Sequence, residues 1–396
     1  MDLNVIGGGL AGLVGALRAA ELGASVDLYE AAGLLGGRAR ATPGAYAAHD
    51  GPHVIYADGA MWRWLRRRSL IGAYRTVSAT DLAAVHFRVN GHRRRVPPAG
   101  LARLLARRML RAPVDTDFAS WVARLHGDQV AKWAANMSGV VTFDPDPGRL
   151  SAAFVWDRIL RVTSLPPKVR YPAHGWGGVI QRIAERATAL GVRIHLDSRV
   201  DMLPNGPTIV ATSLSAARRL LRDPSLTWES GSTLLLDVAV QRRRRDAFVV
   251  SDLDEAGWCE DFSRTAPALA PAGHSLIQAH LPIRAGESRD AANARLAALV
   301  DVAAPNAQTR TLWRRTGSAH GRTGAVDLPG RSWRDRPAIY RGDGVYLAGD
   351  SVAAPGLLGE VAWCSAVWAA EAAVRMPSRR VRRLLNRYEA FSNTAT

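Results

Sequence analysis

Residues 5–12 read Val5-Ile6-Gly7-Gly8-Gly9-Leu10-Ala11-Gly12 and continue an apolar run that begins at Leu3. A short apolar run that ends in glycines predicts a buried strand, and the G-x-G-x-x-G spacing predicts a helix directly after it. The first glycine allows a sharp turn, the second lets backbone approach a ligand closely, and the third lets the helix pack near the strand. The free amides of such a helix start point back at the glycines. The stretch therefore predicts a pyrophosphate site formed by Gly7, Gly9, Leu10, Ala11 and Gly12.

The following residues complete a dinucleotide-binding unit. Apolar side chains recur at helical spacing from Leu10 to Leu17, and Gly23 predicts the end of the helix. A second strand over residues 25–29 ends in Glu30, about 20 residues after the glycines, where a carboxylate can accept a ribose hydroxyl. An acid at this place would repel a 2′-phosphate, so the unit favours a cofactor without one.

Gly36-Gly37-Arg38 distinguishes FAD from NAD. A unit that binds only a nicotinamide dinucleotide has no need of a second glycine pair with an arginine beyond its acid. A longer cofactor that folds over the loop does need them. Gly37 and Arg38 are therefore added to the predicted site.

A second signal lies near the C-terminal end of the sequence. The apolar stretch 344–348 leads into Gly349-Asp350, and the glycine-rich turn 355–360 opens a helix of mostly small residues over 361–374. The start of a helix carries a partial positive charge of about +0.5. Such a charge would favour the anionic reduced form of a flavin.

These motifs resemble the flavin-dependent amine oxidase and phytoene desaturase superfamily. The segment His49-Asp50-Gly51-Pro52-His53-Val54 is most similar to the phytoene desaturase branch. The resemblance implies an α/β fold, in which an FAD-binding Rossmann-type domain of the glutathione reductase and amine oxidase kind is interleaved with an α+β substrate-binding domain.

The resemblance also implies roles for individual residues. Arg38 would lie by the phosphates, and Gly51, Pro52, His53 and Val54 would pass near the flavin ring. The backbone of Val200 would touch the adenine, and Gly349 and Asp350 would bond the ribityl and phosphate region. The amides around Gly356 and Leu358 would face the pyrimidine edge of the flavin.

The same resemblance predicts how the chain divides into domains. The FAD-binding domain is predicted to take residues 1–70, 171–230 and 331–396, and the substrate-binding domain residues 71–170 and 231–330. A hairpin signal at Asn90-Gly91, between two alternating runs, has no place in a plain doubly wound domain. Only residues 201–207 stand where this fold usually inserts a small β meander, so we expect a trimmed FAD domain.

Composition is that of an ordinary globular protein, with 396 residues, 47% of them hydrophobic and 22% charged. No uncharged apolar stretch is long enough for a membrane span, and the glycine loop occupies the place of a signal-peptide core. We therefore expect a cytoplasmic protein. Cys259 and Cys364 lie far apart and are expected to be buried free thiols.

The net charge of +17 does not by itself predict a nucleic-acid partner. All 52 basic residues except Lys132 and Lys168 are arginine, and they are spread over several runs instead of one stripe. The arginine bias resembles a compositional habit, and contact with anionic lipid or with an acidic protein is more plausible than a nucleic-acid function. Residues 98–111 alternate leucines with arginines, which fits either a helix resting on a membrane or a solvated surface helix. Oligomeric state is not predicted.

The sequence does not identify a catalytic acid or base. His53, His174 and Glu360 fall on segments expected near the flavin, but each is more often a packing or hydrogen-bonding residue. His49, Asp50 and His53 lack the further ligands that a metal site needs, so no metal is predicted.

These observations predict an FAD-dependent oxidoreductase that takes hydride from a lipophilic or secondary-metabolite substrate, as a desaturase or dehydrogenase. A flavin amine oxidase is an alternative, although the lysine typical of that branch late in the chain is missing after Lys168. A second alternative is a non-catalytic prenyl- or lipid-binding protein similar to the Rab escort and GDP-dissociation-inhibitor proteins. A third alternative is a dehydrogenase that binds only a nicotinamide cofactor, in which Gly349-Asp350 would have no role.

Overall fold

The computed structural model describes residues 1–51 and 54–375. It divides into two compact units that alternate along the chain. The first contains Met1–Gly37, Ile180–Thr227 and the residues from Arg336 onward, and the second contains Arg38–Val179 and Trp228–Asp335. Residues 38–70 thus lie in the second unit, whereas the sequence analysis places them in the first. The division into an FAD domain and a substrate domain stays a prediction.

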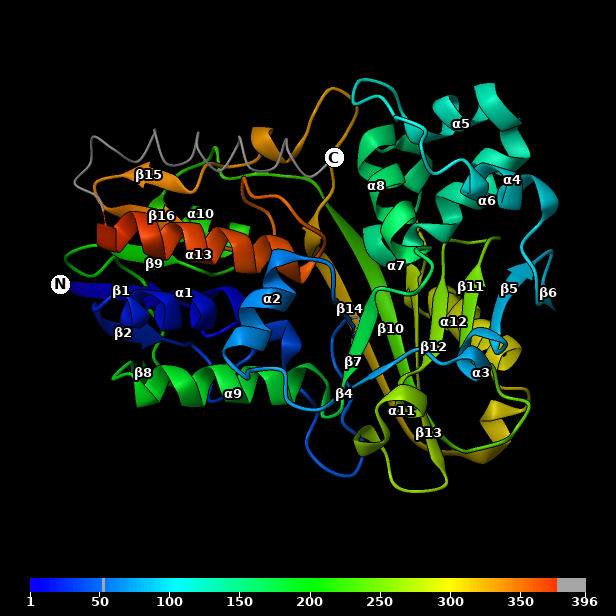
Figure 1. Ribbon diagram of the computed structural model, residues 1–396, viewed down its shortest axis with the longest axis horizontal. Coiled ribbons are helices and arrows are strands. Elements are labelled where there is room, and N and C mark those ends of the chain that lie inside the picture. The colour runs from blue at the N-terminus through cyan, green and yellow to red at the C-terminus, as the bar shows by residue number, and fades with distance from the viewer. Residues whose placement is uncertain (52–53, 376–396) are drawn as a thin grey trace. The chain divides into compact units, whose positions relative to one another are not determined.

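A six-stranded sheet forms the centre of the first unit (Figure 1). Its strands β16, β9, β1, β2 and β8 are parallel, and β15 is an antiparallel edge strand. The order across the sheet is β15 (Tyr340–Gly342), β16 (Val345–Leu347), β9 (Thr208–Val210), β1 (Asp2–Ile6), β2 (Ser25–Tyr29) and β8 (Arg193–His195).

Helices from both ends of the sequence pack together in this unit. The helix α1 (Leu10–Glu21) buries Leu13, Val14 and Leu17 completely, as its apolar spacing predicts. It runs beside α13 (Gly359–Arg375) (Figure 1). Arg18 of α1 forms a 2.6 Å ion pair with Glu371 of α13. The other helices that reach into this unit are α9 (Gly175–Ala189) and α10 (Leu214–Leu221).

The second unit is built on a seven-stranded sheet. The order is β14 (Thr311–Ala325), β10 (Ser230–Gln241), β13 (His274–Pro282), β12 (Trp258–Asp261), β11 (Val249–Asp252), β5 (Val85–Val89) and β6 (His92–Arg94). The helix α12 (Arg289–Ala303) covers one face and buries the apolar side chains that alternate along β10 and β13. A smaller sheet joins β3 (Ile55–Tyr56), β7 (Val169–Pro172) and β4 (Tyr74–Thr76).

A cluster of helices with its own apolar core belongs to the same unit. Its largest buried side chains include Phe118, Trp121 and Trp156. The helices of the second unit other than α12 are α2 (Ala60–Arg67), α3 (Ala79–Leu82), α4 (Ala99–Ala106), α5 (Phe118–His126), α6 (Asp128–Met137), α7 (Gly139–Thr142), α8 (Ala152–Val162) and α11 (Phe262–Thr265).

Several local expectations are confirmed. Asn90 and Gly91 both have positive φ values, 51° and 76°, and join β5 to β6 as a tight hairpin. Residues 196–207 contain no strand, so β8 leads directly to β9. Cys259 and Cys364 are buried free thiols.

The basic segment 98–111 differs from its predicted form. Helix α4 ends at Ala106, earlier than predicted, and Leu101 and Leu104 are fully buried in the helical core, as the solvated surface helix predicts and the membrane-resting helix does not. Beyond the helix, Arg108 donates to carbonyls of Leu160 and Thr163, and these contacts replace a further helical turn. Among the described helices, none combines the length and apolar character needed to cross a bilayer.

Candidate functional site

The carboxyl edge of the parallel sheet brings the two motif-bearing ends of the sequence together. Ile6 of β1 and Leu347 of β16 both pair with Val210 of β9. Gly7 directly follows β1, and Gly349 lies two residues after the end of β16. Because β9 lies between these two strands, the two glycines are about 10 Å apart, two strand spacings, on the same edge. Open α/β sheets bind their ligands at this edge.

Two of the three motif glycines are required by the fold itself. Gly7 has φ +108°, and a Cβ there would lie 2.7 Å from the carbonyl oxygen of Ala211. A Cβ on Gly12 would lie 1.7 Å from the carbonyl oxygen of Gly7. The turn and the close approach of helix to strand therefore exclude any side chain at these positions.

Gly9 differs from its two neighbours in the motif. Its φ of −76° suits any residue, and a Cβ there would meet nothing within 4 Å. Open space above this residue is what a closely approaching phosphate group needs. Gly9 is also the N-cap of α1, has no side chain to cap the helix, and is followed by a first turn without an acidic residue. The amides around Leu10 and Ala11 thus present uncompensated positive charge to a ligand.

The second glycine pair lies against the first. The amide of Gly36 donates to the Gly8 carbonyl at 2.8 Å, and Gly36 forms a bridge with Gly9. Gly37 has φ +52°, and a Cβ there would lie 3.5 Å from the Gly9 Cα atom. The structure therefore brings Gly37 beside the predicted pyrophosphate loop.

Glu30 points back at the same loop. Its carboxylate accepts the amide of Gly8 at 2.6 Å and the amide of Ala32 at 2.8 Å. Each oxygen keeps a lone pair for a further donor, such as a hydroxyl. The Glu30 carbonyl also accepts the Ser198 amide at 2.8 Å, which holds the half-buried Val200 close to this end of β2.

The Gly349-Asp350 turn is held by a side chain of α13. The Ser365 hydroxyl accepts the Gly349 amide at 2.9 Å and lies 3.0 Å from the Gly349 carbonyl, to which it can donate. A small cavity beside this turn is lined by the ends of β9 and β16, including Thr212, Gly349 and Asp350.

The turn before α13 is shaped by Glu360. Its buried carboxylate accepts the Leu357 amide at 3.0 Å. Gly356 and Leu358 take positive φ values of 126° and 53°, and a Cβ on Gly356 would lie 2.7 Å from the Glu360 Cβ. Glu360, named as a candidate acid or base, thus stabilises the start of the helix.

The remaining predicted residues do not belong to this unit. Arg38, Gly51 and Val54 lie in the second unit, and Pro52 and His53 fall outside the described residues. Arg38 is exposed and donates to the carbonyl of Arg322. Their roles near the phosphates and the flavin ring stay predictions. His174, another candidate acid or base, is exposed to solvent.

The segment before Gly51 is anchored by residues that the sequence analysis misses. Asp237, Gln278 and Arg315 are register partners on three neighbouring strands. The His49 carbonyl accepts from Gln278 Nε2 and from Arg315 at 2.8 Å each. Asp237 lies between them and accepts from both, at 2.7 and 2.8 Å.

Arg315 also fixes the residue after His49. It forms a 2.9 Å ion pair with Asp50 in addition to its bonds with Asp237. The His49 carbonyl, Gln278, Asp237 and Arg315 thus form a closed ring of hydrogen bonds, which holds the main chain at His49 and Asp50. Burial raises the pKa of Asp237, although Arg315 and Gln278 oppose this, and burial lowers the pKa of His49 to about 4. His49 is thus neutral at physiological pH.

A buried acid lies next to this ring. Glu260 is the register partner of Gln278 and accepts from the Tyr171 hydroxyl at 2.6 Å and the Trp258 indole at 2.9 Å. Complete burial raises the pKa of Glu260 to about 7, against the opposing effect of these two donors.

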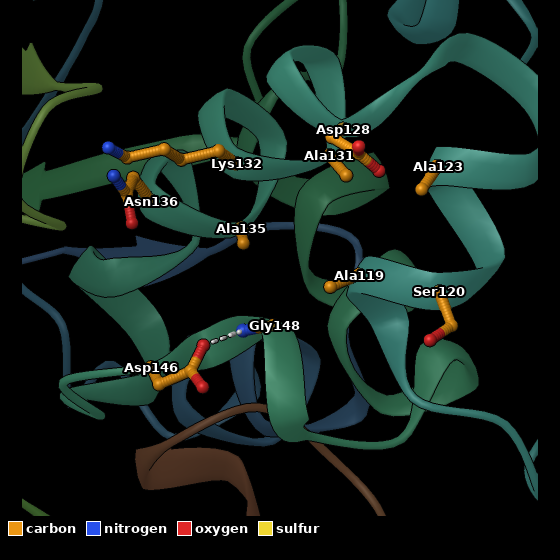
Figure 2. Close-up of a pocket in the computed structure, with 10 residues that line it drawn as sticks. All are labelled: Ala119, Ser120, Ala123, Asp128, Ala131, Lys132, Ala135, Asn136, Asp146 and Gly148. Carbon is orange, nitrogen blue, oxygen red and sulfur yellow. Dashed lines mark hydrogen bonds between the residues drawn. The ribbon is translucent and has the colours of Figure 1, made fainter.

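A further hollow lies elsewhere in the second unit. It lies between α5, α6 and the short helix Pro147–Arg149 (Figure 2). Its volume is about 320 Å³. Its floor is made of small residues such as Ala131, Ala135 and Gly148, while Asp128 and Lys132 stand exposed at its rim. None of the predicted site residues lines it. In the described part of the chain, no three histidine, cysteine or acidic side chains come close enough to hold a metal ion.

Comparison with known proteins supports the assignment of the fold. Residues 5–68 match the model of the NAD(P)-binding Rossmann-like domain. No curated protein matches the chain.

Solved structures resemble nearly the whole chain. An oxidoreductase from Methanosarcina mazei is 16% identical, with a TM-score of 0.75 over 94% of this chain and 100% of that one. Cyclohexylamine oxidase from Brevibacterium oxydans is 17% identical, with a TM-score of 0.72 over 94% and 98%. Reduced UDP-galactopyranose mutase is 14% identical, with a TM-score of 0.67 over 96% and 97%. The chain therefore has a mixed α/β fold with a Rossmann-like dinucleotide unit, of the amine oxidase type.

Proposed function

We propose that the protein is an FAD-dependent oxidoreductase that takes hydride from a lipophilic or secondary-metabolite substrate, as a desaturase or dehydrogenase of the phytoene desaturase-like branch. One observation carries the proposal: the glycine loop, Glu30 and the Gly349-Asp350 turn meet on a single sheet edge. A nicotinamide dinucleotide alone would not account for the second glycine pair or for the distant Gly349-Asp350 turn.

The residues present fit FAD. The open space above Gly9 and the uncapped start of α1 suit a pyrophosphate, and Glu30 keeps acceptor capacity for a ribose hydroxyl. Asp350 follows β16 on the same edge and suits the ribityl region. When bound, FAD supplies the hydride acceptor. The chain's own part is to bind the cofactor, orient the substrate and exclude water.

Two alternatives predict different behaviour. A flavin amine oxidase draws support from the likeness to cyclohexylamine oxidase, but no lysine follows Lys168. A non-catalytic lipid carrier would not need Glu30 and Asp350 at the edge of the sheet. We also propose a cytoplasmic protein, with contact to an anionic membrane or an acidic protein through its arginines.

The proposal is tested by loading the purified protein with FAD and, in parallel, with NAD⁺. We expect FAD to bind tightly, with the visible absorbance of a flavin, and NAD⁺ to bind at least tenfold more weakly. Anaerobic mixing with polyenes, alicyclic alcohols and amines should then bleach the flavin with one class. A protein that cannot be loaded with flavin contradicts the proposal, and bleaching by amines alone favours the amine oxidase alternative.

A further inference from the structure

Two adjacent rows of side chains cross the face of the seven-stranded sheet that α12 does not cover. The Asp237 row consists of Glu260, Gln278, Asp237 and Arg315, which are successive register partners. The His280 row lies two residues further along each strand and consists of Ser251, Trp258, His280, Leu235 and Gly317. Because side chains alternate between faces along a strand, both rows point to the same side.

The two rows differ in how their polar groups are satisfied. In the Asp237 row each side chain has a hydrogen-bond partner. In the His280 row, both ring nitrogens of His280 and the hydroxyl of Ser251 are buried without a partner among the described residues. Each of these two residues is only 3% exposed. A buried polar group without a partner destabilises the folded state, because it has lost its hydrogen bonds to water without replacing them.

The surroundings of His280 are aromatic. The ring of Phe143 lies 5.0 Å from the imidazole, centroid to centroid. Phe143 has φ +54°, an uncommon conformation for a bulky residue, and its carbonyl accepts the Ser232 amide at 3.0 Å. Strain of this kind is typical of functional sites.

Trp258 is the register partner of His280 on the neighbouring strand β12. Its indole N–H donates to Glu260 and is therefore not available to His280. Trp258 and Gly317 are both partly exposed, whereas His280 between them is buried. Leu235 between His280 and Gly317 is buried, so the proposed ligand would reach the imidazole from the Trp258 side, by displacement of the partly exposed indole.

The charge of the row defines the ligand chemistry. None of its five members is charged, since burial lowers the pKa of His280 to about 3 and the imidazole stays neutral at physiological pH. A neutral imidazole offers one N–H donor and one acceptor nitrogen. It therefore matches a neutral hydroxyl or carbonyl group better than a carboxylate or a phosphate.

We propose that the His280 row is a ligand subsite in which His280 hydrogen-bonds an uncharged hydroxyl or carbonyl group on an otherwise apolar ligand. The inference rests on the proposed function in one respect only, because it takes this ligand to be the substrate of the oxidoreductase. Phe143 and Trp258 contact the apolar body of the ligand, and Ser251 offers a further hydroxyl to it.

The first test uses phenol, with toluene as the matched probe that lacks the hydroxyl. Histidine-labelled full-length protein is titrated with each, and the His280 signal is assigned by its loss in His280→Leu. We expect phenol to shift this signal saturably and to bind at least tenfold more tightly than toluene. His280→Gln, which keeps a donor and an acceptor, should retain part of the preference, and His280→Leu should lose it. Equal affinity of the wild-type protein for both probes overturns the proposal.

The second test is stability. His280→Leu removes an unpartnered group and should unfold at the same or a higher temperature. His274→Leu on the same strand is the matched control, because His274 has a partner in the Tyr46 hydroxyl at 3.0 Å, and it should unfold at a lower temperature. A clear loss of stability in His280→Leu means that an internal water satisfies the imidazole, and this overturns the proposal.

The outcomes separate this inference from the proposed function. A protein that binds FAD but treats phenol and toluene alike contradicts the inference alone. A protein that cannot be loaded with FAD but still prefers phenol contradicts the proposed function, and the subsite stands as a ligand site.

Discussion

The two units build polar sites in opposite ways. The first uses main-chain amides, positions without a Cβ and the start of α1, so its chemistry resides in the backbone between Gly7 and Gly12. The second uses side chains that meet across neighbouring strands, as Asp237, Gln278 and Arg315 do around the His49 carbonyl.

This difference determines what each unit tolerates. A backbone site is lost when a Cβ intrudes, and few side chains, such as Glu30 and Ser365, support it. A side-chain network tolerates changes of shape, but it fails when one member of a buried charge pair is removed. Substitutions in each unit test this contrast between a backbone site and a side-chain network.

The largest effect is expected for Gly12→Ala. Its new Cβ would lie 1.7 Å from the Gly7 carbonyl oxygen, so the turn cannot keep its conformation. We expect loss of cooperative folding in the first unit, measured by calorimetry. The matched control is Gly9→Ala, which meets nothing within 4 Å and should melt as the wild type while losing FAD affinity at least tenfold. A stable Gly12→Ala protein would show that the loop is built differently.

The next effect is expected for Arg315→Met. It leaves the buried carboxyl of Asp237 without its cation, and removal of one partner of a buried pair costs about 3–5 kcal/mol. Arg314→Met is the control, because Arg314 is exposed on the next position of β14 and should change the unfolding free energy by less than about 0.5 kcal/mol. Equal denaturation midpoints for the two variants would show that the ring contributes little.

The same contrast explains what could be predicted from the sequence. The strand, glycine loop, helix and terminal acid of the first unit are neighbours along the chain, so spacing alone predicts them. The Gly349-Asp350 turn was recognised by its motif, and the register of β16 and β9 brings it to the same edge.

The side-chain network was not predicted because it depends on register between strands far apart in sequence. Arg315 lies in β14, whose many polar residues and glycines give no apolar pattern, and the sequence analysis predicts no strand there. The sequence analysis considers His49 and Asp50 only as metal ligands and rejects them, and it does not predict their anchors on β10, β13 and β14. The predicted helix over residues 98–111 is longer than the observed α4, which ends at Ala106. Arg108 makes tertiary contacts with the Thr163 carbonyl, and the local leucine and arginine pattern cannot predict such contacts.

A smaller, pH-dependent effect is expected for Glu260→Gln. The folded protein holds the Glu260 proton up to a pKa of about 7, whereas the ordinary value is 4.5. Between these two pKa values the native state binds more protons at Glu260 than the unfolded state does. The free energy of unfolding of the wild type therefore falls relative to that of the variant as pH rises, by about 3 kcal/mol at most.

The measurement is the difference in unfolding free energy between wild type and variant from pH 4.5 to pH 8. Taking this difference removes the opposite trend from His49 and His280, whose lowered pKa values make stability rise with pH. A difference that does not change with pH would show that Glu260 titrates normally.

The smallest effect is expected for Ser365→Ala, and it sharpens the comparison because here the first unit also depends on a side chain. The substitution leaves the Gly349 amide without its acceptor, at a cost of about 1 kcal/mol. If the Gly349-Asp350 turn contributes to FAD binding, affinity should fall by a similar free energy, about fivefold. Ser351→Ala is the control, because the Ser351 hydroxyl lies 3.5 Å from Asp350 and makes a weaker contact. If Ser365→Ala loses stability but binds FAD as the wild type does, the turn serves the fold alone, and the cofactor site rests on the backbone of the N-terminal loop.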